Sequence, residues 1–154
     1  MKISRSNETA WTEAMNQGAF SQRRKPLGGD KVKCSLWELP PGKKSFPLHA
    51  HHGTEEALFV VSGRAKVRTP EGETQIGPAD FVSFPAGGVA HQLINDSKEP
   101  FVYMAMSVSV GLDIVEYPDS KKVACSVGVW PNVKRFVFSE ASQVAYFDGE
   151  KDAG

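Results

Sequence analysis

Three of the four histidines of this chain stand at positions 49, 51 and 52. His49 and His51 are two residues apart, so in an extended chain both imidazoles point to the same side. Glu56 opens the apolar run 57–61, which is typical of a buried strand. Two neighbouring strands could therefore bring His49, His51 and Glu56 into one pocket. They would offer two nitrogen donors and one oxygen donor to a metal ion.

The remaining histidine, His91, is the natural fourth donor. It lies in a strand predicted over residues 89–95, after a turn made by Pro85 and the pair Gly87-Gly88. Three imidazoles and one carboxylate suit a divalent first-row metal: Fe, Mn, Co, Ni, Cu or Zn. Calcium and magnesium prefer sites built from oxygen. The sequence therefore predicts one transition-metal ion held by His49, His51, Glu56 and His91.

Two neighbours of these residues are alternatives. His52 begins a turn with Gly53 and is interpreted as an exposed turn residue, or else as a residue beside the ligands or an alternate ligand. Glu55 is expected to face solvent, but it could replace Glu56 as the oxygen donor.

The chain as a whole predicts one all-β domain. It has 154 residues, of which 40% are hydrophobic and 23% charged, with 14 glycines and 10 prolines. Such turn-formers between many short apolar runs indicate strands joined by tight turns. The 18 basic and 18 acidic residues balance, so charge suggests neither a nucleic-acid nor a membrane partner.

The N-terminus lacks the apolar core of a signal peptide, and no stretch is apolar enough to span a bilayer. The two cysteines, Cys34 and Cys125, form no CxxC pair. Free thiols in a reducing cytoplasm are the expectation.

About eight strands are predicted between residues 32 and 110. A turn at Ser62-Gly63 is expected to pair strand 56–61 with strand 65–69 as a hairpin. Residues 7–20 indicate a weak helical turn at best. The predicted strands lie at 32–39, 46–51, 56–61, 65–69, 73–76, 81–84, 89–95 and 101–110. Their spacing suits a barrel, a jelly roll or an immunoglobulin-like sandwich, and periodicity does not choose among these.

The spacing of the candidate ligands resembles the cupin superfamily. His49-x-His51, four residues, Glu56, six residues and Gly63 are similar to its first motif. A second set is similar to its second motif: Gly77, Pro85-x-Gly87 and His91-x-x-x-Asn95. The six-residue gap to Gly63 favours Glu56 over Glu55. Fragments near both ends of the extension 111–154 resemble an uncharacterised branch of small single-domain cupins.

The resemblance implies a double-stranded β-helix with the metal inside the barrel and pairing into a homodimer. We expect one domain over 1–154, with an N-terminal arm at 1–31, the barrel at 32–110 and an irregular C-terminal extension at 111–154. The regions around Trp11 and residues 127–138 are candidates for the dimer interface. The fold alone implies no reaction.

The expected function is a small metal-dependent enzyme acting on an oxygen-rich small molecule by oxygenation, isomerisation or cleavage. A binding or sensing barrel without turnover is the alternative. Either face of strand 101–110 could line the pocket: Phe101, Tyr103, Ala105 and Ser107, or Val102, Met104, Met106 and Val108. Only the first face brings a polar group, Tyr103, that could act as an acid or base. Cys34 and Trp37 are further candidates for the pocket wall.

Overall fold

The protein is described by a computed structural model at residues 1, 3–29, 31–108, 111–128 and 132–152. Strands dominate these residues, and the only helices that they form are two single 3-10 turns. The predicted all-β class is therefore confirmed. No helix in the described part of the chain has the length and apolar character needed to cross a membrane.

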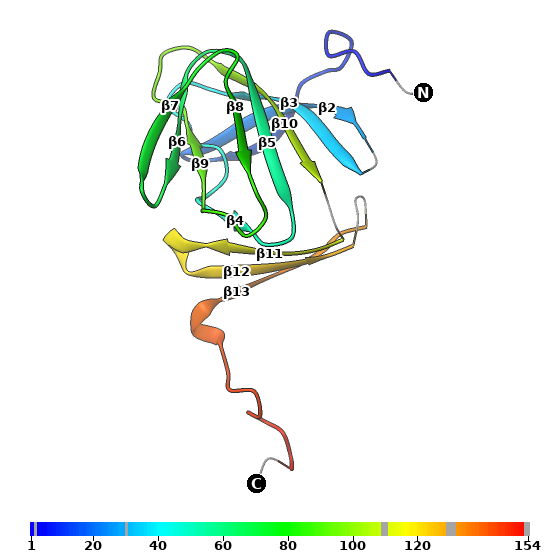
Figure 1. The fold of residues 1–154 in the computed structure, drawn as a ribbon, viewed down its shortest axis with the longest axis vertical. Coiled ribbons are helices and arrows are strands. Elements are labelled where there is room, and N and C mark those ends of the chain that lie inside the picture. The colour runs from blue at the N-terminus through cyan, green and yellow to red at the C-terminus, as the bar shows by residue number, and fades with distance from the viewer. Residues whose placement is uncertain (2, 30, 109–110, 129–131, 153–154) are drawn as a thin grey trace.

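The largest sheet has six strands in the order β1-β2-β3-β10-β5-β8, and every neighbouring pair is antiparallel (Figure 1). Its strands are β1 (Thr12–Gln17), β2 (Phe20–Gly28), β3 (Val32–Leu39), β10 (Phe101–Val108), β5 (Glu55–Ser62) and β8 (Phe81–Phe84). This sheet forms one wall of the barrel.

The opposite wall combines two smaller sheets. One has the order β13-β12-β11-β4 and the other the order β7-β6-β9. Isolated bridges between His49 and His91, and between Lys44 and Ile94, connect the segment before β4 with the segment around β9. The strands are β4 (Ala50–His51), β6 (Ala65–Thr69), β7 (Gly72–Ile76), β9 (Gln92–Ile94), β11 (Leu112–Tyr117), β12 (Lys122–Val127) and β13 (Lys134–Ser139).

The core lies between the two walls. Its buried side chains come from both of them: Trp37, Leu39, Leu58, Val60, Ala65, Val67, Ile76, Leu93, Phe101 and Tyr103. Alternate residues of a strand point to opposite faces, which explains why Phe101 and Tyr103 are buried whereas Val102 and Met104 are only partly buried. The face of β10 that carries Phe101, Tyr103, Ala105 and Ser107 is therefore the inward one.

The predicted hairpin between residues 56–61 and 65–69 is wrong. β5 pairs with β10 and β8, whereas β6 pairs with β7 and β9. At the turn, Gly63 has a φ of +79°, and a Cβ there would collide with the backbone carbonyl of Pro100. The chain therefore turns a corner at Gly63 and passes from one wall to the other instead of folding back on itself.

Both ends of the chain are more regular than the sequence predicts. Residues 7–20 include the end of a turn in which the amides of Glu8 and Thr9 donate to the Arg5 carbonyl. They then form β1 and the start of β2, because β2 pairs along β3 and extends the large sheet. The described residues after 110 form β11, η1 (Pro118–Ser120), β12, β13 and η2 (Glu140–Ser142), in that order. Pro118 ends β11, as expected of a residue that cannot donate to a sheet.

The outer face of β11, β12 and β13 is apolar and exposed. Leu112, Ile114, Val127, Phe136 and Phe138 are all more than two-fifths exposed. After η2 the chain extends away from the barrel (Figure 1) and carries Val144, Tyr146 and Phe147, which are exposed as well. Apolar side chains thus gather on the side of the barrel from which the C-terminal segment departs.

Candidate metal centre

Four side chains from the two walls meet inside the barrel. His51 belongs to β4, which pairs with β11, and Glu56 belongs to β5 of the six-stranded sheet. His49 and His91 pair through their backbones, since the amide of each donates to the carbonyl of the other at 3.2 and 2.8 Å. The antiparallel pairing thus places His49 and His91 side by side, although 42 residues separate them.

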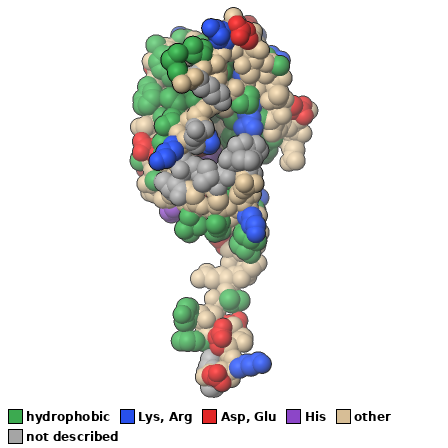
Figure 2. All heavy atoms as spheres, turned by 90° about the vertical axis from the view of Figure 1, so that its right-hand side faces the viewer, with side chains coloured by type: hydrophobic (Ala, Val, Ile, Leu, Met, Phe, Trp, Pro, Cys, Tyr) green, Lys and Arg blue, Asp and Glu red, His purple; other side chains and the backbone are tan. Residues whose placement is uncertain are grey.

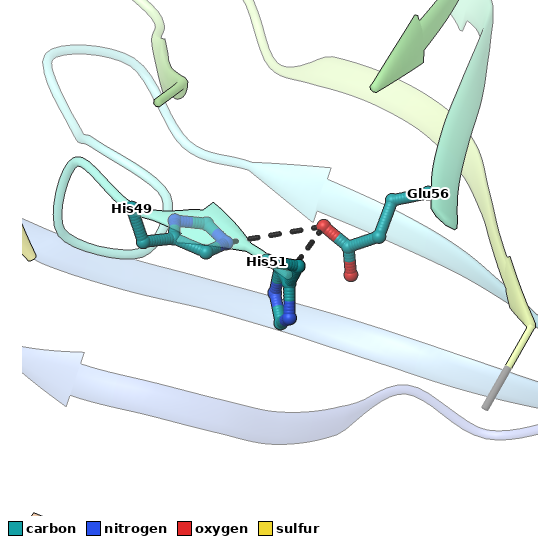
Figure 3. Close-up of side chains that lie close together, drawn as sticks. All are labelled: His49, His51 and Glu56. Carbon is teal, nitrogen blue, oxygen red and sulfur yellow. Dashed lines mark ion pairs between the residues drawn. The ribbon is translucent and has the colours of Figure 1, made fainter. Parts of the chain in front are cut away.

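The three imidazoles surround one carboxylate oxygen. Glu56 Oε2 lies 3.8 Å from His49 Nε2, 3.7 Å from His51 Nε2 and 3.4 Å from His91 Nε2. Figure 3 shows His49 and His51 on one side of this oxygen and Glu56 reaching toward them from β5. All four side chains predicted from the sequence therefore converge.

These distances suit a metal ion. Bonds of about 2.0–2.2 Å to nitrogen and oxygen place neighbouring donors roughly 3.0–3.6 Å apart. The potential ligand atoms of His49, His51 and Glu56 all lie within 4.8 Å of one another. His91 is outside this group of three, although its Nε2 is the imidazole nitrogen nearest to Glu56. A metal ion could thus be held by His49, His51 and Glu56, with His91 beside them.

Hydrogen bonds at the far side of two rings select the tautomer that binds metals. His49 Nδ1 donates to the Pro47 carbonyl at 2.8 Å, because a carbonyl oxygen can only accept. His51 Nδ1 donates in the same way to the Asp113 carboxylate. In the neutral form of each ring, the nitrogen without a proton is then Nε2, which faces Glu56 and is the nitrogen that can bind a metal.

Asp113 is a part of the site that the sequence analysis missed. Its second oxygen accepts a hydrogen bond from the amide of Gly53 at 2.8 Å, so the carboxylate is held from both sides. Burial opposes its ionisation, but the bonds from His51 and Gly53 outweigh burial and lower the pKa of Asp113. An ionised Asp113 fixes the orientation of the His51 ring.

The charges of the site favour metal binding. Burial alone would raise the pKa of Glu56, but the surrounding imidazoles outweigh it and hold this pKa far below its usual range. Burial lowers the pKa of His91 more than the Glu56 carboxylate raises it. His91 also stacks on Phe84, with ring centroids 3.7 Å apart. An ionised carboxylate and a neutral imidazole are the protonation states of metal ligands.

His49, Glu56 and His91 line a cavity of about 590 Å³, a volume typical of sites for small molecules. Much of its wall is aromatic or aliphatic: Trp37, Phe46, Leu58, Phe84, Leu93 and Tyr103. Among the other residues suggested for this wall, Cys34 and Met106 contribute to it, whereas Met104 is not among the described lining residues. Both cysteines are free thiols.

The two alternative ligands lie elsewhere. His52 is exposed, and its Nε2 lies 3.0 Å from Glu116 Oε1. Glu55 is exposed as well, because it follows the opposite parity of β5 from Glu56.

Tyr103 lines the cavity, but its hydroxyl is already engaged. It donates to Gln22 Oε1 at 3.0 Å in a buried contact. Burial, and to a lesser extent the charge of Glu56, raise the pKa of Tyr103 far above its usual value. At neutral pH this residue is therefore a neutral phenol that cannot act as a base, and its single O–H is already used in the bond to Gln22.

Known proteins share this fold. The family model of the cupin domain matches residues 35–109. An uncharacterised protein of Streptomyces coelicolor is 32% identical over 70% of this chain and 96% of its own length. A crystal structure from Acidithiobacillus ferrooxidans, provisionally named a sugar phosphate isomerase, superposes with a TM-score of 0.79 at 27% identity and covers 90% of both chains.

A second crystal structure, a sugar phosphate isomerase of the cupin superfamily from Silicibacter pomeroyi, superposes with a TM-score of 0.78. It covers 96% of this chain and 98% of its own at 18% identity, a likeness that concerns the fold. The family match lies over the strands that bring the three imidazoles and the carboxylate together. The chain therefore belongs to the cupin superfamily.

Proposed function

We propose that the protein is a metal-dependent enzyme acting on an oxygen-rich small molecule, with His49, His51, Glu56 and His91 as metal ligands. One observation carries this proposal: three Nε2 atoms face a single ionised carboxylate, and His49, Glu56 and His91 line a cavity. A divalent cation there would compensate the negative charge of this partly buried carboxylate. When bound, it would polarise oxygen atoms of a substrate.

Isomerisation is the reaction class that we favour among oxygenation, isomerisation and cleavage. The structure that is 27% identical carries the name of a sugar phosphate isomerase, and a polyhydroxylated substrate offers the oxygen pairs that a metal binds. The cavity also has polar side chains near the ligands. Ser107 on β10 stands directly opposite Glu56. Polar groups beside the ligands favour an enzyme over the alternative, a barrel that binds small molecules without turnover.

Neighbouring glutamates provide a matched test of this function. Metal-loaded protein is incubated with aldoses, ketoses and their phosphates, and interconversion is followed by NMR. Glu56→Gln is expected to lower kcat/KM by at least about 100-fold, since metal polarisation supplies several kcal/mol of transition-state stabilisation. Glu55→Gln is expected to retain activity, because Glu55 is exposed.

Activity that persists both after chelation and in Glu56→Gln would refute the metal-dependent reaction. Binding of the same sugars without any turnover would support the non-catalytic barrel instead.

We also propose that two copies pair through the apolar outer face of β11, β12 and β13. Phe136 and Phe138 stack on each other there, with centroids 6.4 Å apart, and both are about half exposed. Sedimentation equilibrium is expected to give twice the chain mass of 16.8 kDa. Replacing Phe136 and Phe138 by Ser is expected to give single chains. A wild-type protein that sediments as one chain at micromolar concentration would contradict this pairing.

A further inference from the structure

The cavity beside the metal ligands carries three cationic side chains. Arg24 of β2, Lys33 of β3 and Arg135 of β13 line it together with His49, Glu56 and His91. Glu56 is the only carboxylate among the described lining residues, and the histidines surround it. Apart from the metal centre, the charged side chains of the described residues that line the cavity are therefore all cationic.

The three cations keep donors available for a ligand. Arg24 lies over the ring of Trp37 at 5.6 Å, Lys33 Nζ donates to the Gly29 carbonyl at 3.2 Å, and Arg135 Nε donates to Ser126 Oγ at 3.0 Å. Within the described parts of the chain, none of the three forms an ion pair with a carboxylate. By contrast, Arg68 on the surface is paired with Asp119 at 2.6 Å.

Strand register relates two of these cations to the metal ligands. On the large sheet, Lys33 stands opposite Ser107, which stands opposite Glu56. On the other wall, Arg135 stands opposite Ser126, which stands opposite Asp113, the partner of His51. Each cation thus lies two strands, or roughly 10 Å, from a group of the metal centre.

Both rows run from the metal centre toward the outer strands of their sheets. Figure 2 faces the end of the molecule where β2 and β3 meet, and shows Lys and Arg side chains on that face.

We infer that Arg24, Lys33 and Arg135 form an anion subsite that holds the phosphate group of a phosphorylated substrate while its oxygens face the metal centre. This inference rests on the proposed function, because it assigns the substrate of the same cavity. A guanidinium offers five donors and an ammonium three. Three such groups offer more donors and more positive charge than the two oxygens of a singly charged carboxylate can use. A phosphate dianion has three terminal oxygens and two negative charges, and it suits them better. The separation from the ligands leaves room for a few carbons between the two ends of the substrate.

Titration calorimetry with glucose 6-phosphate, inorganic phosphate and glucose tests the subsite. The double variant Lys33→Gln/Arg135→Gln is expected to bind both phosphate-containing probes at least tenfold more weakly than the wild type, since charge-assisted hydrogen bonds are lost. Glucose binding is expected to stay the same. Arg135→Lys retains the charge and is expected to restore part of the affinity when compared with Arg135→Gln.

Lys98→Gln provides the control, because it also removes one positive charge but lies outside the cavity. Lys98 is exposed and precedes β10, whereas the cavity is lined by Ser107 at the opposite end of this strand. Unchanged phosphate affinity in the double variant, or an equal loss for glucose, would overturn the subsite. So would a wild type that binds neither phosphate-containing probe.

The same titrations on chelator-treated protein separate this inference from the proposed function. If the subsite exists, inorganic phosphate still binds without metal, and the double variant still loses it. The metal content of the double variant, measured by elemental analysis, is expected to equal that of the wild type. If the wild-type protein never holds metal, the proposed function is refuted. The anion subsite is then still decided by whether the double variant binds phosphate more weakly than the wild type.

Discussion

His51→Ala is expected to lower the affinity for a divalent transition metal by more than about 100-fold. The substitution removes an Nε2 donor 3.7 Å from Glu56 Oε2, and it also leaves the Asp113 carboxylate without its imidazole partner. His91→Ala removes the nitrogen nearest to Glu56 and is expected to have a similar effect. Elemental analysis after dialysis, and competition with a coloured chelator, measure the loss.

Two further substitutions provide an intermediate case and a control for this loss of metal affinity. Asp113→Ala keeps every proposed ligand but frees the His51 ring, so metal affinity should fall by about 10- to 100-fold. His52→Ala is the matched control, because His52 pairs with Glu116 outside the centre, and it should bind metal as the wild type does. Equal metal content in His51→Ala and His52→Ala would rule out His51 as a ligand.

Phe101→Ala is expected to lower the free energy of unfolding by about 3–5 kcal/mol. The Phe101 side chain is fully buried between the walls and stacks on Tyr103, with ring centroids 5.3 Å apart. A domain of this size has a total stability of about 5–15 kcal/mol, so a large share would be lost. Urea denaturation measures it as a lower midpoint at an unchanged slope.

Phe81→Ala is the control for this prediction, since Phe81 is 61% exposed on β8. It is expected to cost less than about 1 kcal/mol. A loss as large as that of Phe101→Ala would mean that the core does not lie where the two walls meet.

The spacing of the histidines, together with the resemblance to the cupin motifs, predicts that four side chains converge. His49 and His51 share a face because of strand periodicity, and Glu56 and His91 follow at spacings similar to those of the cupin motifs. Asp113 escaped this reasoning, because it follows His51 by 62 residues and belongs to no motif. The structure places Asp113 on the same face of β11 as the buried Val115, but the sequence predicts no strand there.

Local patterns failed where tertiary pairing decided the structure. Ser62-Gly63 has the composition of a hairpin turn, yet the strands on either side of it belong to different walls. Polar residues such as Glu13 and Asn16 indicate no strand, but β1 forms because β2 offers it a hydrogen-bonding edge. Local sequence patterns do not show which distant segment a strand will pair with.

The position of β4 has a consequence for the assembly of the barrel. His51 is attached to the wall that contains β11, whereas Glu56 is attached to the six-stranded wall. A cation bound by both residues would cross-link the two walls of the barrel. A free metal concentration of 100 times the dissociation constant would then stabilise the folded state by about 2.7 kcal/mol. The metal concentration would therefore also control the melting temperature of the protein.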